Sequence, residues 1–171
     1  MQVAVASHPV RGVTLAAQTL LLSAIIAASA HISVPFWPVP MTLQTGAVLA
    51  IGACCGWRLG LAAMVAYLVE GLLGLPVFAS GAGPAVLIGP TAGYLVGMLV
   101  AVGIVGLART ASERAWAMLL GTVAIYTLGA GWLGHLIGVD KAITLGVVPF
   151  LLGDAVKAAL AWALSLKFNR G

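Results

Sequence analysis

The residues best suited to chemistry are an acid and a lysine inside an otherwise apolar stretch, in the segment Gly153-Asp-Ala-Val-Lys157. Asp154 and Lys157 are three positions apart, so a helix places them on one face, with Cβ atoms about 5–6 Å apart. A charge inside a membrane is costly unless it is paired or faces a polar cavity. Two interpretations stay open: a pair that neutralises itself and orients the helix, or a site for a ligand with N–H groups and a carboxylate.

Two more polar residues lie in apolar segments. Glu70 lies a few residues before Pro76, so it could reach a cavity shared with Asp154 and Lys157. Alternatively, Glu70 could be protonated and hydrogen-bonded to a neighbouring helix. Gln44 begins another apolar run and suits either a ligand contact or an interhelical hydrogen bond.

The composition says what surrounds these residues. The 171 residues are 62% hydrophobic and only 7% charged, whereas a soluble domain carries about 25% charged residues. This excludes a cytosolic enzyme and a disordered chain, and the scattered basic residues exclude a nucleic-acid binder. We expect one integral-membrane domain over residues 1–171, with the lipid bilayer as its solvent.

The spacing of apolar runs predicts an all-α membrane protein, a bundle of six transmembrane helices. Proline suits a first helical position, so we expect the sixth helix to begin at Pro149. The expected spans are Val13–Ala30, Leu43–Gly56, Leu59–Leu75, Thr91–Ala108, Ala115–Leu136 and Pro149–Lys167.

The basic residues orient the bundle. Lys141 falls among the loops of one side, next to Asp140, whereas six basic residues fall on the other: Arg11, Arg58, Arg109, Arg114, Lys167 and Arg170. Cytoplasmic loops carry the excess of lysine and arginine, so both termini are expected to be cytoplasmic. The opposite loops, His31–Met41 and Pro76–Pro90, are rich in proline or glycine and suit either the lid of a cavity or plain turns.

The chain carries none of the familiar catalytic motifs. It contains no GxxxxGK[ST], HExxH or GxSxG sequence, so we expect neither ATP hydrolysis nor metal or serine hydrolase chemistry. Cys54 and Cys55 are adjacent and without a metal-ligand spacing. We therefore predict no enzyme activity, no catalytic residue, no metal and no cofactor.

Small residues recur on the first span. Ala24 and Ala28 are four positions apart, with Ser23 and Ala27 in the adjacent register. Such spacing lets two helices approach closely, so this face either packs inside the bundle or docks another membrane protein.

Four segments together resemble the BioY family, the biotin-binding S components of energy-coupling-factor (ECF) transporters. They are Pro38-Val-Pro-Met-Thr-Leu-Gln44, Gly74-Leu-Pro-Val-Phe-Ala79, Gly89-Pro-Thr-Ala-Gly-Tyr-Leu95 and Gly153-Asp-Ala-Val-Lys157. The resemblance implies high-affinity biotin capture for uptake, in a six-helix bundle with a cavity near the outer face. It covers nearly the whole chain. Ala92 departs from the family's usual glycine, and Glu70 belongs to no family motif.

The resemblance also implies the site residues. It places biotin contacts on Asp154 and Lys157, and further ones on Gln44 and Tyr94. Asp154 would accept from the ureido group and Lys157 would pair with the carboxylate, or both would serve one end of the ligand. Aromatic residues would cover the ring: Phe36, Trp37 and Phe78.

The implied partners are a transmembrane coupling (T) protein and two ABC-type ATPase subunits, in the cell membrane of a prokaryote. Ala24 and Ala28 match the positions that dock the T protein. Two other functions remain open from the residues: a proton-coupled or facilitative carrier for a small carboxylate, with Glu70 as the proton site, and a helper subunit that binds nothing itself.

Overall fold

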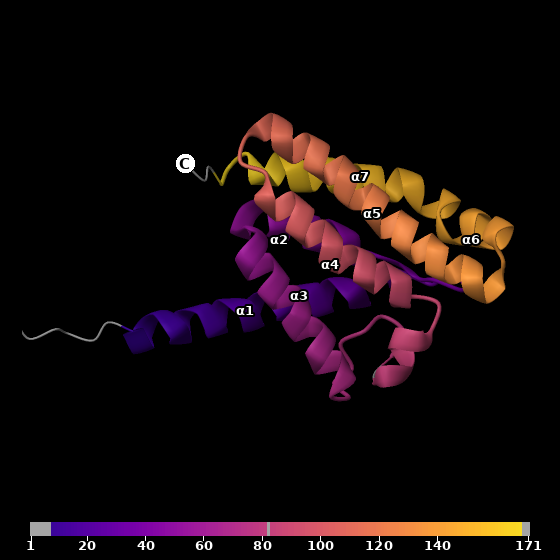
Figure 1. The fold of residues 1–171 in the computed structure, drawn as a ribbon, viewed down its shortest axis with the longest axis horizontal. Coiled ribbons are helices and arrows are strands. Elements are labelled where there is room, and N and C mark those ends of the chain that lie inside the picture. Colours follow the sequence, from indigo (N-terminus) through magenta and orange to yellow (C-terminus); the bar gives the residue numbers. More distant parts are fainter. Residues whose placement is uncertain (1–7, 82, 169–171) are drawn as a thin grey trace, which may run out of the picture.

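The computed structural model describes residues 8–81 and 83–168, which form a helical bundle with one very short sheet (Figure 1). The α-helices are α1 (His8–His31), α2 (Gln44–Cys55), α3 (Trp57–Leu72), α4 (Ala92–Leu107), α5 (Ala111–Ile137), α6 (Val139–Gly146) and α7 (Leu151–Ser165). Two 3₁₀ turns, η1 (Pro84–Ile88) and η2 (Val148–Phe150), precede α4 and α7. Strand β1 (Ser33–Val34) pairs antiparallel with β2 (Met41–Thr42), which makes the chain between α1 and α2 a hairpin.

Three helical segments of the described chain are long and apolar enough to cross a membrane. They are Gly12–His31, Ala111–Ile137 and Val139–Ser165, the last of which joins α6, η2 and α7. The shorter helices Gln44–Cys55 and Ala92–Leu107 are also apolar. Many large hydrophobic side chains on these helices face outward, as in a protein whose surroundings are hydrocarbon.

The last helix differs from the sequence expectation. Pro149 does not begin it but lies within η2, and α7 begins at Leu151. The Phe150 N–H donates to the Val147 carbonyl at 3.0 Å, so the chain makes a tight turn before the helix. The short helix α6, not expected from the sequence, follows Gly138, whose φ of +91° ends α5.

Glycines bring α4 and α5 close together. A Cβ atom at Gly97 would stand 2.6 Å from the Ile125 Cα, so only a residue without a side chain fits there. At Gly129 the ring of Tyr94 fills the space where a Cβ would be. Small residues at helix contacts allow the close packing that holds membrane bundles together.

The two ends of the bundle carry different structures. Figure 1 shows α1 beginning and α7 ending toward the left, where the α2–α3 and α4–α5 junctions also lie. The β-hairpin and α6 lie toward the opposite end. Arg58, Arg109 and Arg114 follow the two helix junctions, whereas Arg170 lies outside the described residues.

Candidate functional site

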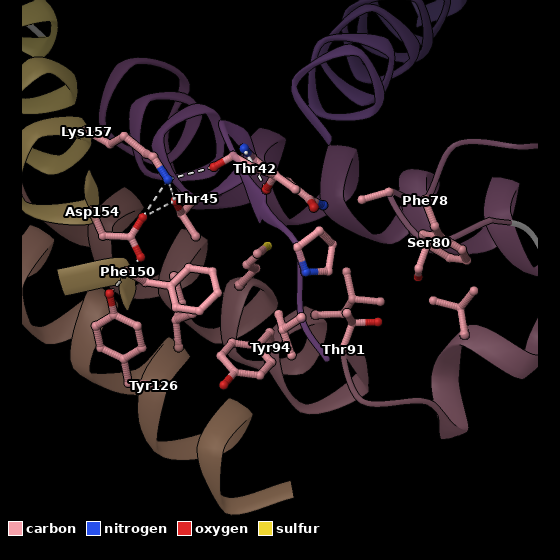
Figure 2. A pocket seen from close by; sticks show the side chains of 18 of the residues that line it. Thr42, Thr45, Phe78, Ser80, Thr91, Tyr94, Tyr126, Phe150, Asp154 and Lys157 are labelled. Atoms are coloured by element: carbon pink, nitrogen blue, oxygen red, sulfur yellow. Dashed lines mark hydrogen bonds and ion pairs between the residues drawn. The ribbon is translucent and has the colours of Figure 1, made fainter. Parts of the chain in front are cut away.

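A cavity lies between the helices near the β-hairpin (Figure 2). Its apolar walls include Phe78, Met98 and Phe150, and its polar lining includes Gln44, Asp154 and Lys157.

The acid and the lysine of α7 form an ion pair in this cavity. Lys157 Nζ lies 2.7 Å from Asp154 Oδ1, and the two side chains are 12% and 6% exposed. Because α7 begins at Leu151, Asp154 is in its first turn, about 4.5 Å along the helix axis. The carboxylate is thus closer to the helix end than a start at Pro149 implies. The pair neutralises itself, as the first sequence interpretation predicts, and it also lines a cavity, which the second interpretation requires.

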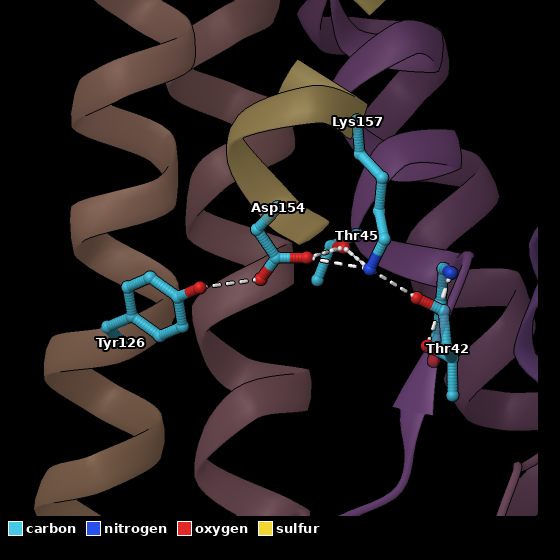
Figure 3. A network of polar contacts seen from close by, with 6 residues as sticks. Thr42, Thr45, Tyr126, Asp154 and Lys157 are labelled. Atoms are coloured by element: carbon cyan, nitrogen blue, oxygen red, sulfur yellow. Dashed lines mark hydrogen bonds and ion pairs between the residues drawn. The ribbon is translucent and has the colours of Figure 1, made fainter. Parts of the chain in front are cut away.

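Hydroxyl and carbonyl groups from three other elements complete this network (Figure 3). Thr45 of α2 donates to Asp154 Oδ1 at 2.8 Å, and Tyr126 of α5 donates to Oδ2 at 2.8 Å. Lys157 Nζ also donates to the Thr42 carbonyl of β2 at 2.6 Å and to the Thr45 hydroxyl at 3.3 Å. Such charge-assisted hydrogen bonds lower the cost of burying the two charges.

Gln44 and Tyr94 line the same cavity. Gln44 is the first residue of α2 and is 3% exposed. The Tyr94 hydroxyl donates to the Gly146 carbonyl at 2.8 Å, which anchors α4 to the end of α6. The structure therefore brings together all four residues on which the resemblance places ligand contacts.

Other sequence candidates lie away from the cavity. Glu70 does not line it, and its Oε2 accepts a hydrogen bond from the buried Ser23 hydroxyl of α1 at 2.5 Å. Of the three aromatic residues expected to cover a ligand ring, only Phe78 lines the cavity. Phe36 instead packs on Phe150, with ring centroids 6.2 Å apart, and Trp37 is 78% exposed. Both follow β1 in the hairpin and lie outside the cavity lining.

The two loops that cover the cavity are tied to each other and to the bundle. His31 Nε2 and the Pro76 carbonyl are 2.8 Å apart, which joins the hairpin side to the loop after α3. Trp132 of α5 donates to the Gly89 carbonyl at 2.9 Å. The Phe78 ring is 1% exposed and packs directly on Gly71, where a Cβ would overlap the ring.

The small residues of α1 divide between two faces. Ala24 and Ala28 are exposed, whereas Ser23 is buried against α3 and Ala27 packs against the core. Ala24 and Ala28 therefore belong to the outward face of α1 and not to its internal contacts.

The family model described as the BioY family matches residues 2–171. This chain belongs to the BioY family. A probable biotin transporter BioY from Pyrococcus horikoshii is 42% identical over 142 residues, which cover 82% of this chain and 87% of that protein. The biotin transporter BioY of Thermotoga maritima is 36% identical over 156 residues, which cover 88% of this chain and 92% of that protein.

A solved structure shares the fold of this BioY protein. It is the crystal structure of the S-component for biotin from an ECF-type ABC transporter, with a TM-score of 0.80 and 24% sequence identity. The match covers 97% of this chain and 96% of that one. The family membership and the apolar helices together indicate that this BioY protein is an integral membrane protein. It belongs to a transport family and so has a non-enzymatic role.

Sequence reasoning missed several cavity residues of this BioY protein: Thr42, Thr45, Tyr67 and Tyr126. A signal for two of them was available, because Tyr67 and Tyr126 are hydroxyl-bearing residues inside apolar spans and a buried hydroxyl needs a partner. Thr45 directly follows Gln44, but nothing in the sequence indicates that its hydroxyl reaches a carboxylate 109 positions later.

Proposed function

We propose that this chain is the biotin-capturing S component of an ECF-type transporter. One observation carries the proposal: a chain of the BioY family encloses an apolar cavity that holds a carboxylate and an ammonium group 2.7 Å apart. Biotin combines an apolar bicycle, ureido N–H and C=O groups, and a carboxylate. The relatives named above carry the name biotin transporter.

The ion pair suits a ligand group that both donates and accepts. The Asp154 carboxylate accepts N–H donors and the Lys157 ammonium donates to an oxygen. Together they carry no net charge, so a neutral ureido group matches them better than an isolated ion does. Gln44 and Tyr94 provide further contacts, and Phe78 covers the apolar bicycle.

The membrane arrangement is part of the proposal. We assign six transmembrane helices, α1 to α5 and α7, with both termini cytoplasmic, in the cell membrane of a prokaryote. The apolar helices and the arginines near the α2–α3 and α4–α5 junctions support this orientation. The cavity then lies near the outer face, where a scarce vitamin is captured.

Uptake then depends on partner proteins. The outward face of α1 with Ala24 and Ala28 docks a transmembrane coupling protein, which is joined to two ABC-type ATPases. The chain itself has no nucleotide-binding P-loop, so its partners provide the energy.

Calorimetry of biotin binding to the purified chain in detergent tests the proposal. Wild type is expected to bind one biotin tightly, and Lys157→Ala and Asp154→Asn to lose binding while remaining folded. Gly131→Ala is the matched control, because Gly131 is exposed on α5 with open space around it. A folded wild type that does not bind biotin would contradict the ligand, and unaltered binding by both charge variants would contradict the site.

A further inference from the structure

We propose that Tyr67 and Gln44 form a second polar subsite in the cavity, which binds a hydrogen-bond acceptor oxygen of the ligand. This inference rests on the proposed function and adds to it a residue, Tyr67, that the sequence did not single out. It divides the cavity into two polar ends with different chemistry.

The first step is that these two side chains are buried without partners. Tyr67 is fully buried and Gln44 is 3% exposed. Neither the Tyr67 hydroxyl nor Gln44 Nε2 makes a hydrogen bond of standard geometry with a described residue. The Gln44 side chain lies close to the Tyr67 oxygen, but a donation from the amide to this oxygen leaves the Tyr67 O–H group without an acceptor. A buried polar group without a partner is costly, so it needs an explanation in a binding site.

The second step is that both unpaired groups are in the lining of the ligand cavity. By contrast, the other buried polar side chains that line this cavity form hydrogen bonds with described residues of the protein. Asp154 accepts from Lys157, Thr45 and Tyr126, and Tyr94 donates to a backbone carbonyl. Among the buried residues of the lining, the side chains with unpaired hydrogen-bonding groups are therefore Tyr67 and Gln44.

The third step is the position of this subsite. The Tyr67 ring meets the Phe78 ring edge-on, with centroids 5.3 Å apart. Figure 2 shows Phe78 across the cavity from Asp154 and Lys157. Tyr67 thus belongs to the Phe78 side of the cavity, and the apolar part of the ligand lies between the two polar ends.

The chemistry of the subsite follows from its donors. An amide NH₂ group only donates, and a phenol hydroxyl donates most readily to an oxygen. No lysine or arginine lines this side, so the partner is an oxygen held by neutral donors. Because the proposed function places the ureido group of biotin at the ion pair, the oxygen at this opposite end belongs to the carboxylate.

Tyr67→Phe is the decisive variant, because it removes a hydroxyl that donates to no acceptor among the described residues. We expect its thermal midpoint without ligand to equal or exceed that of wild type, and its affinity for biotin to fall about tenfold. Gln44→Met, which removes the amide donors at similar size, is expected to weaken binding similarly. Tyr94→Phe is the comparison for stability, because its hydroxyl has a protein partner and its loss should lower the midpoint.

Two analogues identify the oxygen. Biotinol replaces the carboxylate by a hydroxymethyl group, and 2-thiobiotin weakens the ureido acceptor. If Tyr67 binds the carboxylate, the loss of affinity caused by Tyr67→Phe should shrink with biotinol and persist with 2-thiobiotin.

An affinity of Tyr67→Phe within twofold of wild type, or a fall in its thermal midpoint, would overturn the inference. The failure of wild type to bind biotin would instead overturn the proposed function, so the two failures are distinguishable.

Discussion

Tyr126 and Asp154, on helices α5 and α7, are joined by a 2.8 Å hydrogen bond from the phenol to the carboxylate. Both residues line the cavity near the β-hairpin. Both also line an apolar groove between α5 and α7 on the outside of the bundle. This hydrogen bond is therefore part of the wall that separates the cavity from the membrane-facing groove.

Tyr126→Phe should destabilise the protein and weaken ligand binding. The change leaves Asp154 Oδ2 without its hydroxyl donor, and a hydrogen bond to a charged group contributes about 1.5–3 kcal/mol. Thermal unfolding in detergent and calorimetry measure the two effects. Thr122→Val is the control on the same helix, because its hydroxyl bonds only to the Met118 carbonyl. Equal unfolding midpoints for the two variants would show that the hydrogen bond of Tyr126 does not contribute to stability.

The charges of α7 should show strong coupling in a double-mutant cycle. Lys157→Met leaves a buried carboxylate without its ammonium partner, and breaking a buried pair in this way costs about 3–5 kcal/mol. Asp154→Asn should lower the free energy of unfolding by a similar amount. The double variant should lose much less stability than the sum of the losses in the two single variants. Additive effects in the unfolding midpoints would mean that the 2.7 Å ion pair contributes little.

Gly71→Ala should disturb the cover of the cavity. A Cβ at this position overlaps the Phe78 ring, so the ring must leave its place between Gly71 and Tyr67. We expect biotin to dissociate at least tenfold faster and proteases to cut the loop after α3 more readily. Gly131→Ala, with open space around its Cβ, should leave both rates unchanged.

Bulky residues on the outward face of α1 should separate partner docking from ligand capture. Ala24→Leu with Ala28→Leu should block co-purification with the coupling protein, because leucine prevents close approach of two helices. Biotin affinity should stay within twofold of wild type, since neither alanine lines the cavity. Ala159→Leu, at an exposed alanine of α7, is the matched control and should leave co-purification intact.

Glu70→Gln separates the S component from a proton-coupled carrier. Glu70 bonds to Ser23 outside the cavity lining, so the amide should leave biotin binding and partner-dependent uptake unchanged. Uptake by the chain alone that an uncoupler and this variant both abolish would instead favour the carrier.

Much of the helix pattern was predictable, because long apolar runs end at charges, glycines and prolines. The span expected over Thr91–Ala108 is the helix Ala92–Leu107, and Asp154 and Lys157 do share a face of α7. The start of α7 was wrong because proline also suits a 3₁₀ turn, and only the packing around η2 decides between them. Trp37 was expected over the cavity, yet it lies outside the cavity lining.

Five of the cavity residues were named from the sequence, but most of their interactions were not: Gln44, Phe78, Tyr94, Asp154 and Lys157. Ion pairing at three-residue spacing is a local property of a helix and so is readable from the sequence. The contacts of Thr45 and Tyr126 with Asp154 join residues 109 and 28 positions apart, and they depend on how helices pack. The unpaired Tyr67 hydroxyl could be found only by accounting for every buried polar atom.

The polar network also has a consequence for biosynthesis. Its two charges lie on α7, whereas Thr45 and Tyr126 belong to helices that precede α7 in the chain and are synthesised earlier. Until α7 enters the membrane, those hydroxyls have no carboxylate to bind and the cavity lacks one wall. The proposed site is therefore assembled only after α7 has been synthesised, and a bound ligand would mark those copies in which α7 is in place.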